Sequence, residues 1–320
     1  MSTKYTFLLP AYKPDFFEEA LRSIKSQTLK DFKVLVSDDC SPHDLKSIYN
    51  KVCGDDARFT YRRNEVNMGR KSLVSHWNLL VDMCDTEYFI LASDDDVYEP
   101  TFLEKVDKLA SKYPEVDLIR ARVKKINADK VLEEDSPRSE FEQQLVFLMN
   151  TYKSKQIQCI ANYAFKTQGL RDIGGFISFP LAWGSDEATV VSLSKHGIAI
   201  TDEVLFSFRW SGKNVSTNMN PNILKKKIAA RKLQIELYKK YFSGLEKNVT
   251  EEYRDTLAKI EQIYKNKAVE SIFYDLPILS FAELLGLRHF LLSICYFRNY
   301  RDSIRFIWFW FKQKYVCKKI

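Results

Sequence analysis

The stretch YTFLLPAYKPDFFEEALRSIKSQTLKDFKVLVSDD, residues 5–39, decides the fold class of this chain. Its two ends, YTFLLPAY and FKVLVSDD, are short apolar runs of the kind found in buried strands. Between them Phe17, Leu21 and Ile24 recur at helical spacing and form one apolar face. The stretch therefore predicts a strand, a helix and a second strand that lies parallel to the first.

The same alternation continues to about residue 92. It predicts a helix near residues 43–52, a strand at RFTYRR (58–63), a helix at KSLVSHWNLLVDM (71–83) and a strand at EYFILA (87–92). Alternating strands and helices are typical of the α/β class, in which a mainly parallel sheet is flanked by helices on both faces. Ligands of such sheets bind beyond the carboxyl ends of the strands, so we expect the functional site there.

Two acidic groups stand at those strand ends. SDDCSPHD (37–44) follows the second strand and SDDD (93–96) follows the fourth. A run such as Asp94, Asp95 and Asp96 is often only a solvated turn, because Asp favours turns and caps helices. It is also a donor set for Mg²⁺ or Mn²⁺, which bind carboxylate oxygens together with substrate phosphates. Two acidic groups at one crevice favour a functional site over two unrelated turns.

The composition is that of an ordinary globular protein, and it excludes several classes. The 320 residues are 45% hydrophobic and 28% charged, with a net charge of +7 that weakly favours anionic partners. Six cysteines without a CxxC pair indicate neither a zinc cluster nor a disulfide framework, and they fit a reducing compartment. We find no signal-peptide core, no run long enough to span a membrane and no nucleic-acid-binding module, so we expect a cytoplasmic protein without a nucleic-acid partner.

The pattern changes after the alternating half. Residues 115–218 mix short strand-like and helix-like segments, and Lys-rich helical segments follow residue 220. We therefore predict one domain over residues 1–218 and a helical region over residues 219–320. The alternative is that the second region is only an appended arm.

The last forty residues interleave aromatic and basic side chains, as in RFIWFWFKQK (305–314). One interpretation is a helix packed on the rest of the protein. The other is an interfacial helix, peripheral on an anionic membrane surface at the inner face of the cell membrane. The second interpretation puts aromatic rings at the headgroup level and ammonium groups beside the phosphates, from Trp308, Phe309, Trp310, Phe311, Lys312, Lys314, Lys318 and Lys319.

Several motifs in one order resemble the family 2 glycosyltransferases of the GT-A fold. LLPAYKPDFFEEALRSIKSQTLKDFKVLVSDDCSPHD (8–44) is similar to the opening of that family, and NEVNMGRKSLVSHWNLLV (64–81) to its Asn-x-Gly segment. YFILASDDDVYEPTFLE (88–104) resembles its metal-binding DxD segment. LRDIGGF (170–176) and WGSDEATVVSLSKHG (183–197) resemble its Gly-Gly-Phe turn and the acidic segment that supplies its catalytic base.

The resemblance covers roughly residues 4–216 and implies a GT-A, Rossmann-like fold with a C-terminal helical extension. It implies an inverting glycosyltransferase that moves a sugar from a nucleotide-diphosphate sugar, UDP favoured, to a hydroxyl of a surface-glycan or lipid-linked acceptor. Asp39, or its neighbour Asp38, would accept a hydrogen bond from the nucleotide base. The base pocket would be lined by the residues at the end of the first strand, Pro10, Ala11 and Tyr12.

By the same resemblance, Asp94 and Asp96 match the alternating carboxylates of a DxD element. They would hold a Mg²⁺ or Mn²⁺ ion between the protein and the diphosphate. In a second register Ser93 takes the place of the first Asp, and Asp95 and Asp96 form the acidic pair. Asp96 is a candidate ligand in both registers and is therefore the first choice.

The resemblance also implies a general base, which takes the proton of the acceptor hydroxyl on the face opposite the diphosphate. Asp186 is the first candidate, because its distance to Gly197 matches the spacing in the family. Many relatives carry Glu-Asp here, whereas this chain has Ser185-Asp186-Glu187, so Glu187 stays open as the alternative. A capped helix start at this point is compatible with either role.

Further contacts follow from the same resemblance. Trp183 would stack on a sugar ring, unless it is simply buried, and Arg209 in FRWSGKNVS (208–216) would contact a phosphate. No histidine stands where the family carries one after this arginine, so we expect no histidine ligand from this loop. The Asn-x-Gly segment would contact the donor, although a solvent-facing helix start fits equally well, through Asn67, Gly69, Arg70 or Lys71.

Two rival interpretations remain. Sugar nucleotidyltransferases share the superfold and the use of Mg²⁺, but they bring a Gly-rich loop that LLPAYKPDFF lacks. A carbohydrate-binding or scaffold protein on a degenerate transferase fold would explain Ser93, Ser185 and the missing histidine. The two acidic groups and Asp186 favour an enzyme over this second rival.

Overall fold

The computed structural model describes residues 3–127, 130–153, 156–211, 220–245, 251–293, 296 and 300–316. The chain divides into two compact units, residues 1–214 and residues 215–320. The boundary predicted after residue 218 falls outside the described residues.

The first unit is built on a mixed sheet that has ten strands in the described part of the chain. The strand order is β3-β2-β1-β4-β9-β6-β10-β5, with β7 beside β6 and β8 beside β10. The strands are β1 Tyr5–Ala11, β2 Lys33–Asp38, β3 Phe59–Arg63, β4 Tyr88–Leu91, β5 Val97–Tyr98, β6 Leu118–Asn127, β7 Lys130–Glu134, β8 Phe141–Glu142, β9 Tyr163–Lys166 and β10 Ile198–Arg209.

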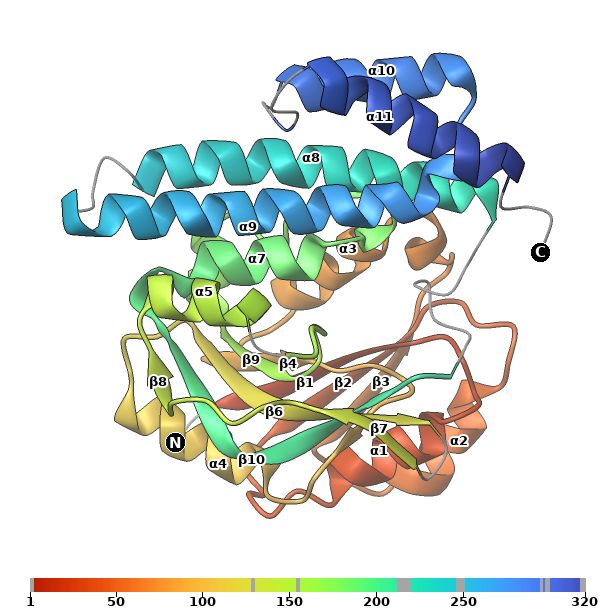
Figure 1. The fold of residues 1–320 in the computed structure, drawn as a ribbon. Helices are drawn as coiled ribbons and strands as arrows, with labels where there is room; N and C mark the ends of the chain where they lie inside the picture. Colours follow the sequence, from red (N-terminus) through yellow and green to blue (C-terminus); the bar gives the residue numbers. More distant parts are fainter. Residues whose placement is uncertain are drawn as a thin grey trace. The chain divides into compact units, whose positions relative to one another are not determined.

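Helices cover both faces of this sheet (Figure 1). On the face of α1, α2 and α4, the ring of Phe7 in β1 lies 6.3 Å from that of Phe102 in α4. On the face of α3, Trp77 packs edge-on against Phe176, which in turn contacts Phe89 of β4. The helices of this unit are α1 Phe17–Lys25, α2 Leu45–Cys53, α3 Met68–Asp82, α4 Phe102–Lys112, α5 Gln144–Lys153, α6 Thr167–Asp172 and α7 Ser185–Leu193.

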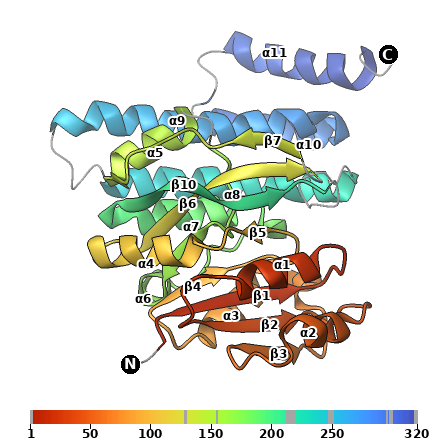
Figure 2. The same cartoon turned by 90° about the horizontal axis from the view of Figure 1, so that it is seen from below.

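The strands β3, β2, β1 and β4 are parallel and lie side by side (Figure 2). Ala11 at the end of β1 is in register with Asp38 at the end of β2, and the Ala92 amide after β4 donates to the Leu8 carbonyl. The residues that follow these strands therefore meet at one edge of the sheet. The prediction of an α/β fold with a mainly parallel sheet flanked by helices is confirmed, although β9 is inserted antiparallel between β4 and β6.

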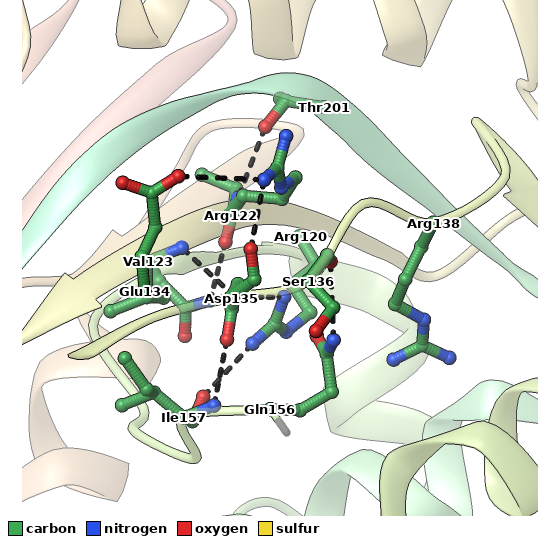
Figure 3. A network of polar contacts seen from close by, with 12 residues as sticks. Arg120, Arg122, Val123, Glu134, Asp135, Ser136, Arg138, Gln156, Ile157 and Thr201 are labelled. Atoms are coloured by element: carbon green, nitrogen blue, oxygen red, sulfur yellow. Dashed lines mark hydrogen bonds and ion pairs between the residues drawn. The ribbon is translucent and has the colours of Figure 1, made fainter. Parts of the chain in front are cut away.

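A buried ion pair ties β6 to two loops (Figure 3). Asp135 and Arg120 are both fully buried, with 2.7 Å between carboxylate and guanidinium. The same carboxylate accepts from the Val123 amide at 2.9 Å and from the Ile157 amide at 2.7 Å. Asp135 thus fixes the start of the loop that carries Cys159.

The second unit is helical. Its helices are α8 Pro221–Leu245, α9 Glu251–Asp275, α10 Phe281–Ser293 and α11 Tyr300–Phe311, and all four contribute to one core. The helices α8 and α9 lie side by side along much of their length (Figure 1). Within the described residues, no helix combines the length and apolar character needed to cross a membrane.

We predict that Asp135→Ala lowers the free energy of unfolding by about 3–5 kcal/mol, because it leaves the Arg120 charge buried without its partner. Asp55→Ala is the matched control: it breaks an exposed pair with Lys25 and should cost at most about 1 kcal/mol. Urea denaturation measures both. Equal effects of the two substitutions would show that the buried pair does not hold the fold.

Candidate functional site

The segment Tyr12–Lys13 lies between the two acidic groups predicted from the sequence. The carboxylate of Asp94, after β4, accepts from the backbone amides of Tyr12 and Lys13, both at 2.7 Å. On the other side, the Ser41 hydroxyl after β2 donates to the Tyr12 carbonyl at 2.6 Å. The ends of β1, β2 and β4 are thereby joined into one site.

The other two carboxylates of the run have different partners. Asp95 forms an ion pair with the Lys13 ammonium at 3.1 Å. Asp96 accepts from the Arg209 amide at 2.8 Å and from the Ser93 hydroxyl. All three carboxylates are buried. The negative charge of this cluster is partly offset by the ammonium of Lys13, a residue that the sequence motifs did not indicate.

Burial and mutual repulsion shift the pKa values of this cluster. Burial raises the pKa of Asp96 to about 7, and the charges of Asp95 and Asp94 add to the shift. Burial also raises the pKa of Asp94, against the opposing effect of the bonds from Lys13 and Tyr12. The pKa of Lys13 is raised because the three carboxylates outweigh the opposing effect of its own burial. Additional positive charge is therefore favourable at this point.

Arg209 organises the acidic run from β10. Its side chain donates to the Asp95 carbonyl at 2.8 Å and pairs with Glu19 at 2.7 Å, and its guanidinium lies 4.2 Å from the Phe16 ring centre. The side chain is buried. The structure thus turns Arg209 toward the protein, and the phosphate contact expected from the sequence stays a prediction.

Asp38 and Asp39, which end β2, both bind neighbouring chain segments. Asp38 is fully buried, accepts from the Ser41 amide at 2.8 Å and from the Tyr61 hydroxyl at 2.6 Å, and is also bonded to Arg63. These bonds hold the turn after β2, where Cys40 has a φ of +55°. Asp38 therefore supports the turn.

Asp39 holds the start of α3. It accepts from the amides of Met68 at 2.8 Å and Gly69 at 2.7 Å, and from the Asn64 side chain at 2.9 Å. A Cβ on Gly69 would lie 2.9 Å from this carboxylate, which explains why a glycine follows Asn67 by two positions. Asn67 caps the helix by accepting from the Arg70 amide.

The other residues that the sequence places near the donor differ in their exposure to solvent. Arg70 and Lys71 are exposed at the start of α3, which leaves both available to a ligand. Tyr12 is also exposed, whereas Ala11 is buried and Pro10 is half-buried. Pro10, Ala11 and Tyr12 line the sheet edge beside Asp39.

His76 supports the Asp39 site from α3. It is buried, with its Nε2 at 3.0 Å from the Ser37 hydroxyl and 3.3 Å from the Asn64 amide nitrogen. Its Nδ1 lies 3.8 Å from the Asp39 carboxylate. Burial lowers the pKa of His76, against the opposing charge of Asp39.

Asp186 lies in the first turn of α7, after a strained segment. Leu181 and Ala182 have φ values of +61° and +56°, and Gly184 has +78°. Left-handed backbone costs about 1–2 kcal/mol at a residue with a side chain, and such strain is common at functional sites. The cost is offset partly by Ser185, whose buried hydroxyl accepts from the Phe179 amide at 3.0 Å.

The N-cap position of α7 is Gly184, and Asp186 and Glu187 both lie in the first turn of the helix. The Asp186 carboxylate accepts from the Glu187 amide at 2.8 Å, and Asp186, Glu187 and Trp183 are all half-buried. A half-buried carboxylate at a helix start is accessible to a substrate hydroxyl. The geometry does not separate Asp186 from Glu187.

Cys159 connects this helix start to the acidic run. The pKa of its thiol is raised well above the ordinary value, first by burial and next by the charge of Asp96, with further contributions from Asp135 and Asp186. Asp96 and Asp186 therefore both lie within electrostatic reach of one thiol. Sequence reasoning missed Cys159, because it lies in no motif.

The acidic run has the donor chemistry of a hard cation. No group of three or more His, Cys, Asp or Glu side chains is arranged around a metal position within the part of the chain that the structure describes. Mg²⁺ in proteins is nevertheless usually held by only one or two carboxylates, and substrate phosphates and water complete its coordination. The Lys13 ammonium against Asp95 shows that a cation fits at this point.

A family model for "Glycosyl transferase family 2" matches residues 6–170. Among curated proteins, CgeD of Bacillus subtilis is 25% identical over 141 residues, which is 42% of this chain and 33% of that protein. The GalNAc(5)-diNAcBac-PP-undecaprenol beta-1,3-glucosyltransferase of Campylobacter jejuni is 30% identical over 94 residues, 29% of this chain and 30% of that protein. The chain thus spans about a third of the length of these two relatives.

Solved structures share the fold at low identity. S. aureus TarS 1–349 in complex with UDP-GlcNAc has a TM-score of 0.56 at 17% identity, with 86% of each chain covered. The mannosyltransferase PcManGT from Pyrobaculum calidifontis, in complex with GDP-Man and Mn²⁺, has a TM-score of 0.52 at 14% identity, with 100% of this chain and 89% of that chain covered. These similarities show a GT-A fold.

We predict that His76 makes the stability of the protein depend on pH. In the unfolded chain a histidine titrates near pH 6.5, while burial lowers the pKa of His76 in the fold. Below about pH 6.5 the histidine binds a proton in the unfolded chain but not in the folded protein. The contribution of His76 to the free energy of unfolding is therefore lost as the pH falls.

Urea denaturation between about pH 5 and pH 8 tests this, with His76→Asn compared with wild type. The difference between the two profiles separates His76 from Asp96, whose raised pKa stabilises the fold at low pH. His43→Asn, at an exposed histidine, is the control. Parallel profiles for wild type and His76→Asn would contradict the prediction.

Proposed function

Because the chain belongs to glycosyl transferase family 2, we propose that it is an inverting glycosyltransferase. In this proposal it moves a sugar from a nucleotide-diphosphate sugar to a hydroxyl of a surface-glycan or lipid-linked acceptor. Residues 1–218 would form the catalytic domain and residues 219–320 a separate helical region.

The observation that carries the proposal is the convergence of two carboxylate sites. The acidic run at the end of β4 is held against the end of β1 by Asp94, and Ser41 ties the acidic group after β2 to the same segment. In this proposal the donor diphosphate binds at the acidic run, and its sugar faces the base at the start of α7.

The nucleotide would bind at the edge of β1 and β2. Tyr12 is exposed there, and the Asp39 carboxylate is held at fixed geometry by three donors. Asp39 is our first candidate for the base contact and Asp38, which is bonded to its own turn, is the alternative; both side chains are buried. Arg70 and Lys71, which are exposed, would approach the phosphates.

The residues of the acidic run would hold the divalent cation. Asp95 faces the ammonium of Lys13, which an incoming divalent cation could replace, and Asp96 is a candidate in both registers that the sequence allows. We therefore propose Asp95 and Asp96 as the ligand pair, which is the second of these registers. When bound, a Mg²⁺ or Mn²⁺ ion would supply charge neutralisation for the leaving nucleotide diphosphate.

The general base would lie at the start of α7. As the acceptor oxygen attacks the anomeric carbon, Asp186 would take the hydroxyl proton, and the bond to the diphosphate would break with its electron pair on the leaving oxygen. Attack from the face opposite the diphosphate inverts the anomeric carbon. Glu187 is the alternative base, and Trp183 would stack against the sugar.

The relatives support the substrate classes that we propose. UDP-sugars come first because TarS is similar in fold and was solved with UDP-GlcNAc. A lipid-linked acceptor is supported by the name of the Campylobacter jejuni relative, a glucosyltransferase acting on an undecaprenol-linked glycan. PcManGT was solved with GDP-Man and Mn²⁺, so GDP-sugars belong in any donor panel.

We predict that the protein releases nucleoside diphosphate from one of a panel of UDP-, GDP- and dTDP-sugars, and that chelation of divalent cations abolishes this release. Asp186→Asn should lower turnover by about a hundredfold or more while donor binding persists, because a general base acts on the chemical step. Asp95→Asn should remove the stabilisation of the protein by nucleotide plus Mn²⁺, seen as a shift in melting temperature.

Asp85→Asn serves as the matched control, since it removes a carboxylate from an exposed pair with Lys33. If no donor is hydrolysed, binding of the same panel decides, because some transferases wait for their acceptor. Failure to bind any nucleotide, with or without metal, would overturn the proposal and leave a binding protein on a transferase fold.

A second prediction concerns the segment before Asp186. Gly184→Ala and Gly174→Ala each place a side chain at positive φ, +78° and +84°, and each should cost on the order of 1 kcal/mol of stability. Only Gly184→Ala should also lower turnover, because Gly184 sets the direction in which α7 begins. Equal turnover of the two variants, measured at saturating donor, would mean that α7 does not carry the base.

A further inference from the structure

The helix α11 is apolar on two opposite sides. Phe306 and Trp310 are only 5% and 4% exposed and belong to the core of the second unit. Ile304, Trp308 and Phe311 are 49%, 63% and 51% exposed, and their spacing of four and three residues places them on one helical face. We call this second side the α11 outer face.

The structure corrects part of the expectation drawn from the sequence. Trp310, expected at the headgroup level of a membrane, is buried in the core instead. Lys314 donates to the Leu279 carbonyl and lies 4.8 Å from the Trp310 ring, so it faces inward as well. Lys318 and Lys319 lie outside the described residues.

Basic side chains border the α11 outer face. The Arg305 side chain is 82% exposed, with Asp302 at 3.8 Å. Lys312 is exposed, and its ammonium lies 5.6 Å from the Trp308 ring centre. The outer face therefore combines aromatic rings with cations.

The C-terminal region that contains α11 carries a net positive charge. Residues 284–320 contain eight Lys and Arg against the single acidic Asp302, a surplus of seven. The whole chain has 49 basic and 42 acidic residues, which is the same surplus, so residues 1–283 are balanced at 41 of each. The exposed Phe and Trp side chains of the described residues also all lie in α10 and α11.

We propose that the α11 outer face, defined by Ile304, Trp308 and Phe311 with Arg305 and Lys312 at its border, docks on an anionic lipid surface. Exposed aromatic rings flanked by Lys and Arg have the composition of an interfacial helix, in which the rings enter the headgroup region and the cations meet lipid phosphates. The basic residues of α8, seven Lys and Arg against one Glu over residues 221–245, have no exposed Phe or Trp of their own helix beside them, so only the α11 outer face combines cations with exposed Trp and Phe rings among the described residues.

A second copy of the chain fits this face less well. In a two-fold symmetric contact the same patch meets itself, so Arg305 and Lys312 of both copies would be brought together. Juxtaposed like charges oppose association. The inference does not depend on the transferase activity, although it would bring a lipid-linked acceptor to the enzyme.

The test is sedimentation of the full-length protein with vesicles of phosphatidylcholine alone or with about a third phosphatidylglycerol. Wild type should sediment with the anionic vesicles only, and raising the salt from about 0.05 M to about 0.5 M should release it. Reversing two charges with Arg305→Glu and Lys312→Glu should weaken binding by on the order of tenfold or more, and Trp308→Ser should weaken it by a similar factor.

Matched substitutions on α8 control for charge and apolar area. Lys239→Glu with Lys240→Glu makes the same change of charge, and Leu233→Ser removes an exposed apolar side chain; neither should alter vesicle binding. Circular dichroism checks that each variant is folded. Tryptophan fluorescence gives an independent readout: adding anionic vesicles should shift the emission of wild type to the blue, and this shift should be lost in Trp308→Phe.

Two outcomes would overturn the proposal. One is wild-type protein that stays in solution with anionic vesicles at low salt, or variants of the outer face that bind as wild type does. The other is a wild-type protein that is a dimer by light scattering and does not bind vesicles, together with a Trp308→Ser variant that is a monomer. That result would assign the outer face to a second copy of the chain.

Discussion

The carboxylate of Asp94, with two successive backbone amides bonded to it, is the contact on which the site depends. Hydrogen bonds to an ionised acceptor are short and strong, and both of these are 2.7 Å long inside the protein. They fix the backbone of Tyr12 and Lys13 just beyond β1. That backbone in turn directs the Lys13 ammonium toward Asp95.

The acidic cluster is tolerated because each of its three carboxylates has its own hydrogen-bond donor or cation. Backbone amides serve Asp94, an ammonium serves Asp95, and the Arg209 amide serves Asp96, while the Arg209 guanidinium is itself neutralised by Glu19. Burial, together with the neighbouring charges of Asp95 and Asp94, raises the pKa of Asp96 to about 7. A cation that arrives with a diphosphate would complete this compensation, and the lysine keeps its place until then.

Much of the fold was predictable, because local pattern and tertiary structure agree in the first hundred residues. The apolar run YTFLLPA is buried on both faces of the sheet, as a central parallel strand must be. The acidic groups were predictable for the same reason: parallel strands end at one edge. The strand β9 was not, since four residues carry too little periodicity to be separated from their neighbours.

The details of the site depend on contacts distant in sequence, which pattern cannot supply. Lys13 and Asp95 are 82 residues apart, and Arg209 reaches the Asp96 carboxylate across 113 residues. The partners of the Arg209 side chain, Glu19 and Phe16, are also distant in sequence and belong to no motif that includes Arg209. Likewise Trp308 and Trp310 are two residues apart, so on a helix they face different sides, and the sequence alone could not say which side the core would take.

The position of β9 has a consequence for the order in which the sheet is assembled during synthesis. β6 pairs only with strands that follow it in the chain, namely β7, β9 and β10, among the described residues. Until β9 has left the ribosome, β4 is the open edge of a four-stranded parallel sheet, with its unpaired amides and carbonyls exposed. The nascent protein is therefore most vulnerable to association through this edge between the emergence of β4 and that of β9, and it closes the edge by inserting a strand made more than seventy residues later.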